Sequence, residues 1–312
     1  MRLTTWAVVV ILLFAGTGAR AQLSEGERSA ALIGNHYEVE ANITYLVASN
    51  YEAKVDVYRP HLAKAPVPVV MMIHGGGWVA GTKEGSILYL LPYLEMGFAV
   101  VNVEYRMARV APAPAAVEDC LCALHWIGRN AKKYNFDLAK VIVTGGSAGG
   151  HLALTTAMIP ESAGFESICA YQDDENWSGP WTSKRPKVAA VVNWFGITDV
   201  ADMLQGPNIR AYAVSWLGSQ PNREDLAKRL SPLSYVRADL PPILTIHGDA
   251  DALVPYSHAV RLHDALNKAR VRNQLFTVPR GGHGEFTDEQ QAKAFEVIRT
   301  FLAGAGITSL GK

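Results

Sequence analysis

The feature that most constrains this chain is a glycine-rich turn around one serine, in the stretch from Val141 to His151 that reads VIVTGGSAGGH. An apolar, β-branched run precedes the turn and a helix-forming segment, Leu152 to Met158, follows it, so the pattern predicts a strand, a tight turn and a helix. Glycines surround Ser147 in the order G-x-S-x-G, and a strained strand-to-helix turn needs neighbours without Cβ atoms. Ser147 would stand exposed above the sheet, at a helix start that favours a developing negative charge. The alternative is a serine that only caps the helix.

A second glycine-rich segment strengthens the catalytic interpretation. The continuous apolar run from Val67 to Ile73 is typical of a central strand buried on both faces, and it leads into His74-Gly75-Gly76-Gly77-Trp78. Consecutive glycines leave backbone N–H groups open to close approach, which is what an oxyanion hole requires.

Two later segments supply partners for the serine. The buried strand predicted at Pro242 to Ile246 leads into HGDADALVP, where Asp249 and Asp251 are both placed to orient a catalytic imidazole. His283 lies on a glycine-rich loop after the last predicted strand, Gln274 to Val278. The chain order serine, acid, histidine is that of a Ser-Asp-His triad.

Strands that alternate with helices predict an α/β fold with a mostly parallel central sheet and helices on both faces. Residues 197–232 interrupt this order, and we expect them to form a small cap over a pocket at the carboxyl ends of the strands. The other expected elements are antiparallel edge strands at Val39 to Val47 and Ala53 to Tyr58, strands at Phe98 to Val103 and Val188 to Trp194, and helices at Leu88 to Met96, Ala115 to Tyr134 and Asp288 to Leu302.

The N-terminus has the pattern of a signal peptide. Arg2, an apolar run from Trp6 to Ala15 and the small-residue site Ala19-Arg20-Ala21 predict cleavage near Ala21 and a secreted or periplasmic protein, with one domain over residues 22–312. The alternative is a membrane anchor, but the apolar run falls short of the ~20 residues that span a bilayer. The 29 basic and 29 acidic side chains give no net field, which argues against a nucleic-acid partner.

Because we expect export to an oxidising compartment, the three cysteines could form a disulfide. Cys120 and Cys122 are two apart in a predicted helix, so they point to different sides and cannot bridge each other. Cys169 lies in a loop-like stretch after the serine's helix, and we expect a disulfide from it to Cys120 or Cys122. The alternative is three buried free thiols.

Together, HGGG at residues 74–77, GGSAG at 145–149, HGDAD at 247–251 and His283 resemble the HGGG-type esterase and lipase branch of the α/β-hydrolases. Within that branch, HGDADALVP at residues 247–255 and Tyr105-Arg106 make the chain most similar to bacterial secreted feruloyl- and acetyl-esterase-like enzymes. The resemblance implies Ser147 as nucleophile, His283 as general base and Asp251, rather than Asp249, as the acid. It also implies that N–H groups of Ala148, Gly76 and either Gly75 or Gly77 bind the oxyanion, with no metal and no cofactor.

The resemblance implies hydrolysis of a small-molecule or polysaccharide-linked ester. No later segment has the pattern of a transmembrane helix, so we expect no stable membrane insertion. Two other interpretations remain open: a serine exopeptidase of the prolyl-oligopeptidase type, and a non-catalytic binding protein on the same fold. For the substrate-binding wall we expect Trp78, Trp194 and Trp181, because aromatic walls suit planar or short apolar acyl groups. The alternative is that these tryptophans fill the core of the cap.

Overall fold

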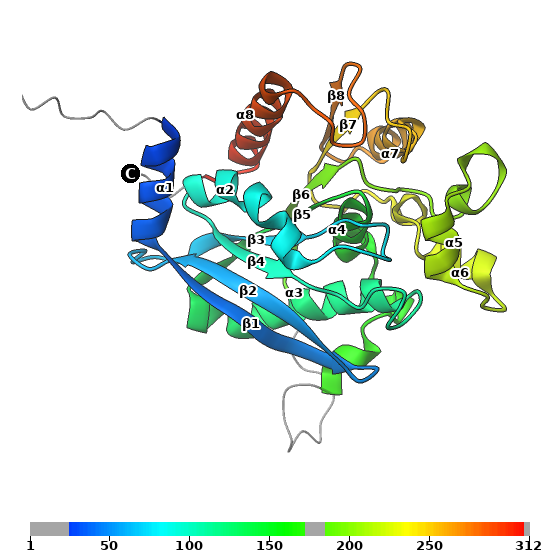
Figure 1. Ribbon diagram of the computed structural model, residues 1–312, viewed down its shortest axis with the longest axis horizontal. Helices are drawn as coiled ribbons and strands as arrows, with labels where there is room; N and C mark the ends of the chain where they lie inside the picture. The colour runs from blue at the N-terminus through cyan, green and yellow to red at the C-terminus, as the bar shows by residue number, and fades with distance from the viewer. Residues whose placement is uncertain (1–24, 172–184, 309–312) are drawn as a thin grey trace, which may run out of the picture.

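One eight-stranded sheet forms the centre of the molecule in the computed structural model, which describes residues 25–171 and 185–308 (Figure 1). The strands are β1 (Tyr37–Ala48), β2 (Tyr51–Pro60), β3 (Val67–Ile73), β4 (Ala99–Val103), β5 (Phe136–Gly146), β6 (Val188–Trp194), β7 (Ile243–Gly248) and β8 (Asn273–Val278). Their order in the sheet is β1-β2-β4-β3-β5-β6-β7-β8. The pairs β1–β2 and β2–β4 are antiparallel and all others are parallel, so the expected antiparallel edge and parallel centre are both present. The predicted signal peptide lies outside the described residues.

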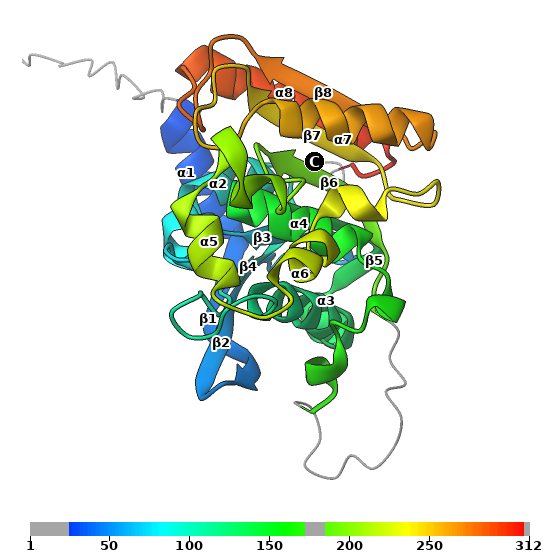
Figure 2. The same cartoon turned by 90° about the vertical axis from the view of Figure 1, so that its right-hand side faces the viewer.

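Helices cover both faces of the sheet (Figure 2). The helices are α1 (Glu25–His36), α2 (Ile87–Glu95), α3 (Ala115–Tyr134), α4 (Ala148–Met158), α5 (Ala211–Leu217), α6 (Arg223–Arg229), α7 (Ser257–Lys268) and α8 (Asp288–Gly304). One core cluster packs α3, α4 and α7 against the sheet, and a second packs α2 and α8 against the other face. The fold is therefore of the α/β kind that the sequence predicts, with both faces of the mostly parallel sheet buried.

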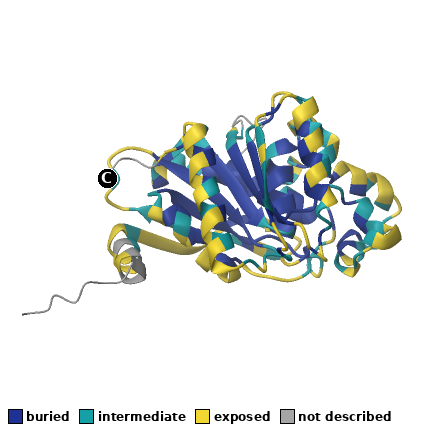
Figure 3. Ribbon diagram, turned by 90° about the horizontal axis from the view of Figure 1, so that it is seen from above, coloured by how far each residue is buried: buried dark blue, intermediate teal, exposed yellow. Residues whose placement is uncertain are grey.

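The strand β3 shows why the central strands read as continuous apolar runs. All of its residues are buried. Val69 and Met71 belong to the cluster on the α3 side, whereas Val70 and Met72 belong to the cluster on the α8 side. Successive side chains point to opposite faces, so a strand covered on both faces needs an apolar residue at every position. Figure 3 shows the buried sheet between helices whose outer faces are exposed.

Most predicted elements lie within one or two residues of those observed, but α1 was not predicted. It immediately precedes β1 and packs its Ile33 against the α8-side cluster. Its apolar face is short, which leaves little periodic signal in the sequence. Among the described residues, no helix combines the length and apolarity that crossing a bilayer requires.

The insertion between β6 and β7, which we call the cap, contains α5, α6 and three short 3₁₀ helices, Asp202–Leu204, Gly206–Asn208 and Pro232–Tyr235. Its first part is fastened to α7. Arg261 forms ion pairs with Asp199 at 2.9 Å and with Asp202 at 3.1 Å, and Nε2 of His258 lies 3.1 Å from the Asp202 carboxylate. These contacts fasten the start of the insertion to α7.

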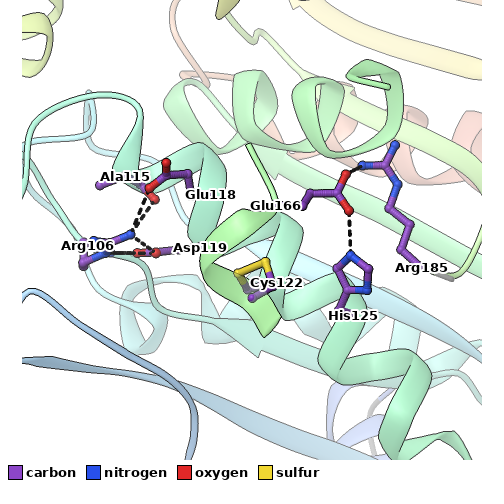
Figure 4. Close-up of a disulfide and its surroundings, with 9 residues drawn as sticks. Arg106, Ala115, Glu118, Asp119, Cys122, His125, Glu166 and Arg185 are labelled. Carbon is purple, nitrogen blue, oxygen red and sulfur yellow. Dashed lines mark hydrogen bonds and ion pairs between the residues drawn. A yellow bond between two sulfur atoms is a disulfide. The ribbon is translucent and has the colours of Figure 1, made fainter. Parts of the chain in front are cut away.

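The disulfide joins Cys122 on α3 to Cys169, and Cys120 stays a buried free thiol. Figure 4 shows Cys122 between two ion-pair groups along α3. On one side Arg106 pairs with the buried Asp119 at 2.6 Å. On the other, Glu166 bridges His125 and Arg185, and Arg185 also donates to the carbonyl of Ile159 at the C-terminal end of α4. The disulfide that the sequence predicted from Cys169 is therefore present, and the structure selects Cys122.

Candidate active site

Ser147 occupies a sharp turn between β5 and α4. Its φ of 57° and ψ of −121° are unusual for a residue with a side chain. Two backbone hydrogen bonds hold it there: its N–H donates to the carbonyl of Trp194 at 2.9 Å, and its own carbonyl accepts from the N–H of His151 at 2.9 Å. A strained backbone conformation that surrounding contacts hold in place is common at functional sites.

Glycines beside Ser147 are required by close packing against β3. A Cβ atom at Gly149 would lie 2.1 Å from the carbonyl oxygen of Ile73, and one at Gly145 would lie 2.4 Å from the same atom. Neither approach is possible for a larger residue. The G-x-S-x-G pattern is thus explained by the backbone of the neighbouring strand as well as by the turn itself.

Asp251 and His283 are brought together by the loops after β7 and β8. Nδ1 of His283 donates to Oδ2 of Asp251 at 2.7 Å, because a carboxylate can only accept. The other carboxylate oxygen, Oδ1, accepts from the backbone N–H groups of Leu253 at 2.8 Å and Val254 at 2.9 Å. Asp251 is therefore held at both oxygens before any substrate is present.

A second imidazole, that of His247, lies 3.2 Å from the same Oδ2 atom. Burial alone would raise the pKa of Asp251, but hydrogen bonds from His247, His283 and the N–H of Val254 outweigh burial and hold this pKa well below its usual range. Asp251 is therefore an anion at neutral pH. The sequence analysis assigned no role to His247, although its place at the start of the HGDAD segment was a usable signal.

Asp249, the alternative acid, lies apart from the imidazole. Its side chain is exposed and accepts from the backbone N–H of Arg280 at 2.6 Å. It serves to join the two loops rather than to orient His283.

Ser147 and His283 line one cavity of about 550 Å³ at the carboxyl ends of the strands. The expected wall residue Trp194 lines it too, with Phe195, whose ring centroid is 4.7 Å from that of His283. Further lining residues come from α2, α5, α8 and the loop after β7, and they are Tyr89, Tyr212, Phe295 and Leu253. The walls are mainly aromatic and aliphatic.

Trp78 was expected in that wall, and this expectation is corrected by its position. Its side chain is fully buried and does not line the cavity, although the adjacent residues Gly77 and Val79 do. It packs instead against Trp216 of α5, with ring centroids 4.1 Å apart and planes 14° from parallel. The left-handed φ of Trp78, 60°, turns its side chain beneath the cap. Trp181, the third expected residue, lies outside the described residues.

The loop of residues 74–78, which we call the oxyanion loop after its expected role, lies directly against the serine turn. A Cβ atom at Gly75 would meet the carbonyl oxygen of Gly146 at 2.8 Å and Cβ of Ser147 at 3.6 Å. Gly76, with φ of 113°, is in a region that favours glycine. Ala148 is the first residue of α4, so its N–H has no acceptor within the helix. Gly75 and Ala148 thus adjoin Ser147, and Gly76 lines the same cavity as Ser147.

The base of the oxyanion loop is supported by Tyr105, to which the sequence analysis gave no structural role. Its ring stacks on that of His74 with centroids 4.3 Å apart, and its hydroxyl donates to the carbonyl of His74 at 3.1 Å. Both side chains are buried.

No group of three or more metal-ligating side chains that could hold an ion occurs in the described ranges.

Comparison with known proteins gives one matching family model and relatives that include named esterases. A family model described as BD-FAE matches residues 55–266. The chain is 29% identical to a probable carboxylic ester hydrolase, LipM, of Mycobacterium tuberculosis over 64% of this chain and 45% of the relative, and 27% identical to the esterase LipQ of the same organism over 70% and 50%. The chain therefore spans about half the length of these relatives.

Solved structures match more of the chain. A truncated carbohydrate esterase from gut microbiota superposes with a TM-score of 0.70 and 29% identity, over 87% of this chain and 97% of that one. A propionate-bound esterase of Thermogutta terrifontis has a TM-score of 0.70 and 23% identity, over 89% and 97%, and that likeness concerns the fold.

Proposed function

The chain belongs to the BD-FAE family, and from that premise we propose that it is a serine hydrolase of carboxylic esters with Ser147, His283 and Asp251 as its triad. The observation that carries this proposal is the 2.7 Å hydrogen bond from Nδ1 of His283 to Asp251, in a cavity that Ser147 and the oxyanion loop also line. The names of the mycobacterial relatives and of the gut carbohydrate esterase support the same chemistry.

In the proposed mechanism Ser147 attacks and His283 moves the proton. With Nδ1–H donated to Asp251, the neutral imidazole carries its lone pair on Nε2. Nε2 takes the proton from Oγ as Oγ bonds to the carbonyl carbon, and the imidazolium then gives that proton to the leaving alcohol. An acyl-enzyme remains, which water hydrolyses by the same two proton transfers in the second half of the reaction.

Backbone N–H groups of Gly75, Gly76 and Ala148 stabilise the negative charge on the former carbonyl oxygen. Since the start of α4 adds its helix dipole, the charge develops where the backbone is most positive. Asp251 keeps the imidazole in one tautomer and stabilises its positive charge.

Small esters with an aromatic or short acyl group fit the cavity best. A volume of about 550 Å³ is within the range of small-molecule sites, and Trp194, Phe195 and Phe295 offer flat apolar walls. We therefore propose hydroxycinnamate or acetate esters, including those linked to plant polysaccharide, as substrates. The carbohydrate esterase among the similar structures supports this choice.

We propose that the protein is exported from the cytoplasm. The signal-peptide pattern of residues 1–21 supports it, as does the disulfide from Cys122 to Cys169, since disulfides persist chiefly in oxidising compartments.

A substrate panel tests the proposal: methyl ferulate, p-nitrophenyl acetate, p-nitrophenyl palmitate and a prolyl nitroanilide. We expect turnover of the first two, weak turnover of palmitate, and none of the nitroanilide. A serine-directed fluorophosphonate should abolish activity and label the peptide that contains Ser147. Turnover of the nitroanilide alone would favour an exopeptidase, and the absence of both labelling and turnover would favour a binding protein.

A further inference from the structure

The end of the oxyanion loop has a backbone conformation that requires support from outside the loop. Gly76, Gly77 and Trp78 have consecutive positive φ angles of 113°, 61° and 60°. Glycine adopts such angles readily, but a tryptophan seldom does. Backbone hydrogen bonds to the carbonyls of Gly76 and Trp78 hold part of this conformation, and the fully buried side chain of Trp78 adds contacts outside the loop.

One of those contacts is a directed hydrogen bond. Nε1 of Trp78 donates to Nδ1 of His151 at 3.2 Å, and the two rings meet edge to face with centroids 4.9 Å apart. The other principal contact is the parallel stack on Trp216 of the cap. Trp78 does not line the cavity, so neither contact involves the substrate directly.

His151 connects this bond to the nucleophile. It lies one turn after Ser147 on α4, and its backbone N–H donates to the carbonyl of Ser147 at 2.9 Å. Nε2 of the same side chain lies 2.7 Å from the carbonyl oxygen of Leu230, where the cap ends. One buried residue thus contacts the serine turn, the oxyanion loop and the cap.

The partners of His151 define its protonation. An indole N–H can only donate, so Nδ1 must accept, and a carbonyl can only accept, so Nε2 must carry the hydrogen. The ring is therefore the neutral Nε2–H tautomer. A proton on Nδ1 would oppose the indole N–H and break the bond to Trp78.

We infer that His151 is a positioning residue that sets the oxyanion loop against Ser147 through the Trp78 indole N–H. This inference rests on the proposed ester hydrolysis. Because an oxyanion hole acts on the transition state, loosening the loop should lower kcat and leave KM nearly unchanged. A small displacement of a positioned group can cost up to about a hundredfold in rate.

The stacked partner, Trp216, provides a matched control. In the described part of the chain its Nε1 is buried without a hydrogen-bond partner. Trp78→Phe and Trp216→Phe therefore remove similar ring area from the same stack, but only Trp78→Phe removes a hydrogen bond. On p-nitrophenyl acetate we expect Trp78→Phe to lower kcat about ten- to a hundredfold at unchanged KM, and Trp216→Phe to stay within about threefold of wild type.

A second pair of variants tests the acceptor on α4. Asn and Leu have similar shapes, but the side-chain oxygen of Asn can replace Nδ1 as acceptor. We expect His151→Asn to retain most of the wild-type kcat and His151→Leu to reproduce the loss in Trp78→Phe. Thermal melts of all four variants verify that each is folded at the assay temperature.

The hydrogen bond can also be observed without any activity. The chain has seven tryptophans, and Trp78→Phe assigns the indole N–H signal of Trp78 in a ¹⁵N spectrum of the full chain. That signal should move in His151→Leu and stay near its wild-type position in His151→Asn.

Equal kcat values in Trp78→Phe and Trp216→Phe, or equal values in His151→Asn and His151→Leu, would overturn the inference, as would an indole signal indifferent to His151→Leu. A wild-type protein that hydrolyses none of the panel esters would instead refute the proposed function, and the spectra would still report on the bond.

Discussion

His283 and Asp251 are joined by a 2.7 Å hydrogen bond from Nδ1 to Oδ2, although they lie on separate loops 32 residues apart in the chain. The parallel pairing of β7 with β8 makes this possible, because it places the carboxyl ends of both strands at the same edge of the sheet. The acid is also fixed by two backbone N–H groups, so the imidazole is oriented by a carboxylate that is itself immobile.

Replacement of the nucleophile is the most direct test of the triad. Ser147→Ala removes one hydroxyl and leaves both backbone hydrogen bonds of the turn in place, so we expect a folded protein. Turnover of p-nitrophenyl acetate should fall on the order of a millionfold, since triad members act as a unit. Circular dichroism and a thermal melt provide the control for folding. Wild-type turnover in this variant would refute the triad.

The two neighbouring carboxylates should differ sharply in effect. Asp251→Asn leaves His283 without an anion to orient it, and kcat should fall about ten-thousandfold. Asp249→Asn alters only the exposed bond to the N–H of Arg280 and should retain activity within about threefold of wild type. Both are measured on the same ester. The opposite ranking would transfer the acid role to Asp249.

Loss of the disulfide should lower stability. Cys122 and Cys169 close a loop with a sequence separation of 47. In the double variant Cys122→Ala with Cys169→Ala, we expect the free energy of unfolding to fall by roughly 2–4 kcal/mol. Urea unfolding with and without reductant measures it.

The free thiol supplies the control for that experiment. Cys120→Ala should keep the wild-type sensitivity to reductant, whereas the double variant should have none. A wild-type protein whose unfolding does not respond to reductant would show that the disulfide contributes nothing to stability.

Stability should also decrease in mild acid because of His151. Burial lowers the pKa of this histidine from 6.5 to about 4. Between these values the unfolded chain binds a proton that the folded chain does not, so unfolding becomes easier as the pH falls. The free energy of unfolding should fall by about 1.4 kcal/mol for each pH unit within that window. This loss is absent above pH 6.5 and no longer grows below pH 4.

Urea unfolding from pH 7.5 to 4.5 measures this slope. The variant His151→Asn should show a shallower slope than wild type, whereas His61→Asn, which removes an exposed imidazole, serves as the matched control. Equal slopes for wild type and His151→Asn would mean that His151 takes up its proton in the folded state.

The negative charge of Glu285 at the cavity should slow the hydrolysis of negatively charged esters. Among the described residues that line the cavity, Glu285 is the one acidic side chain, and it is exposed. Glu285→Gln should raise kcat/KM for monomethyl succinate about two- to fivefold at low salt and leave methyl butyrate unchanged. Glu289→Gln, on the outside of α8, is the control. Equal effects on both esters would mean that Glu285 acts by shape.

The local patterns around Ser147, Gly75–Gly77 and His283 were sufficient to predict the fold class, most element boundaries and the residues that now lie around one cavity. The reason is that these signals are local. A strand buried on both faces must be apolar at every position, as β3 is, and a strained turn against a neighbouring backbone must have glycine, as at Gly145 and Gly149.

Contacts between distant segments were not predictable in this way. The choice of Cys122 over Cys120 depends on which face of α3 meets the segment after α4, and the placement of Trp78 depends on a single backbone angle that turns it beneath α5. His151, His247 and Tyr105 act through partners 30 or more residues away or across a turn whose shape is set by packing. A sequence shows which residue types are available for such contacts, but only the packed chain decides which atoms come within hydrogen-bond distance, because that depends on the positions of all the elements at once.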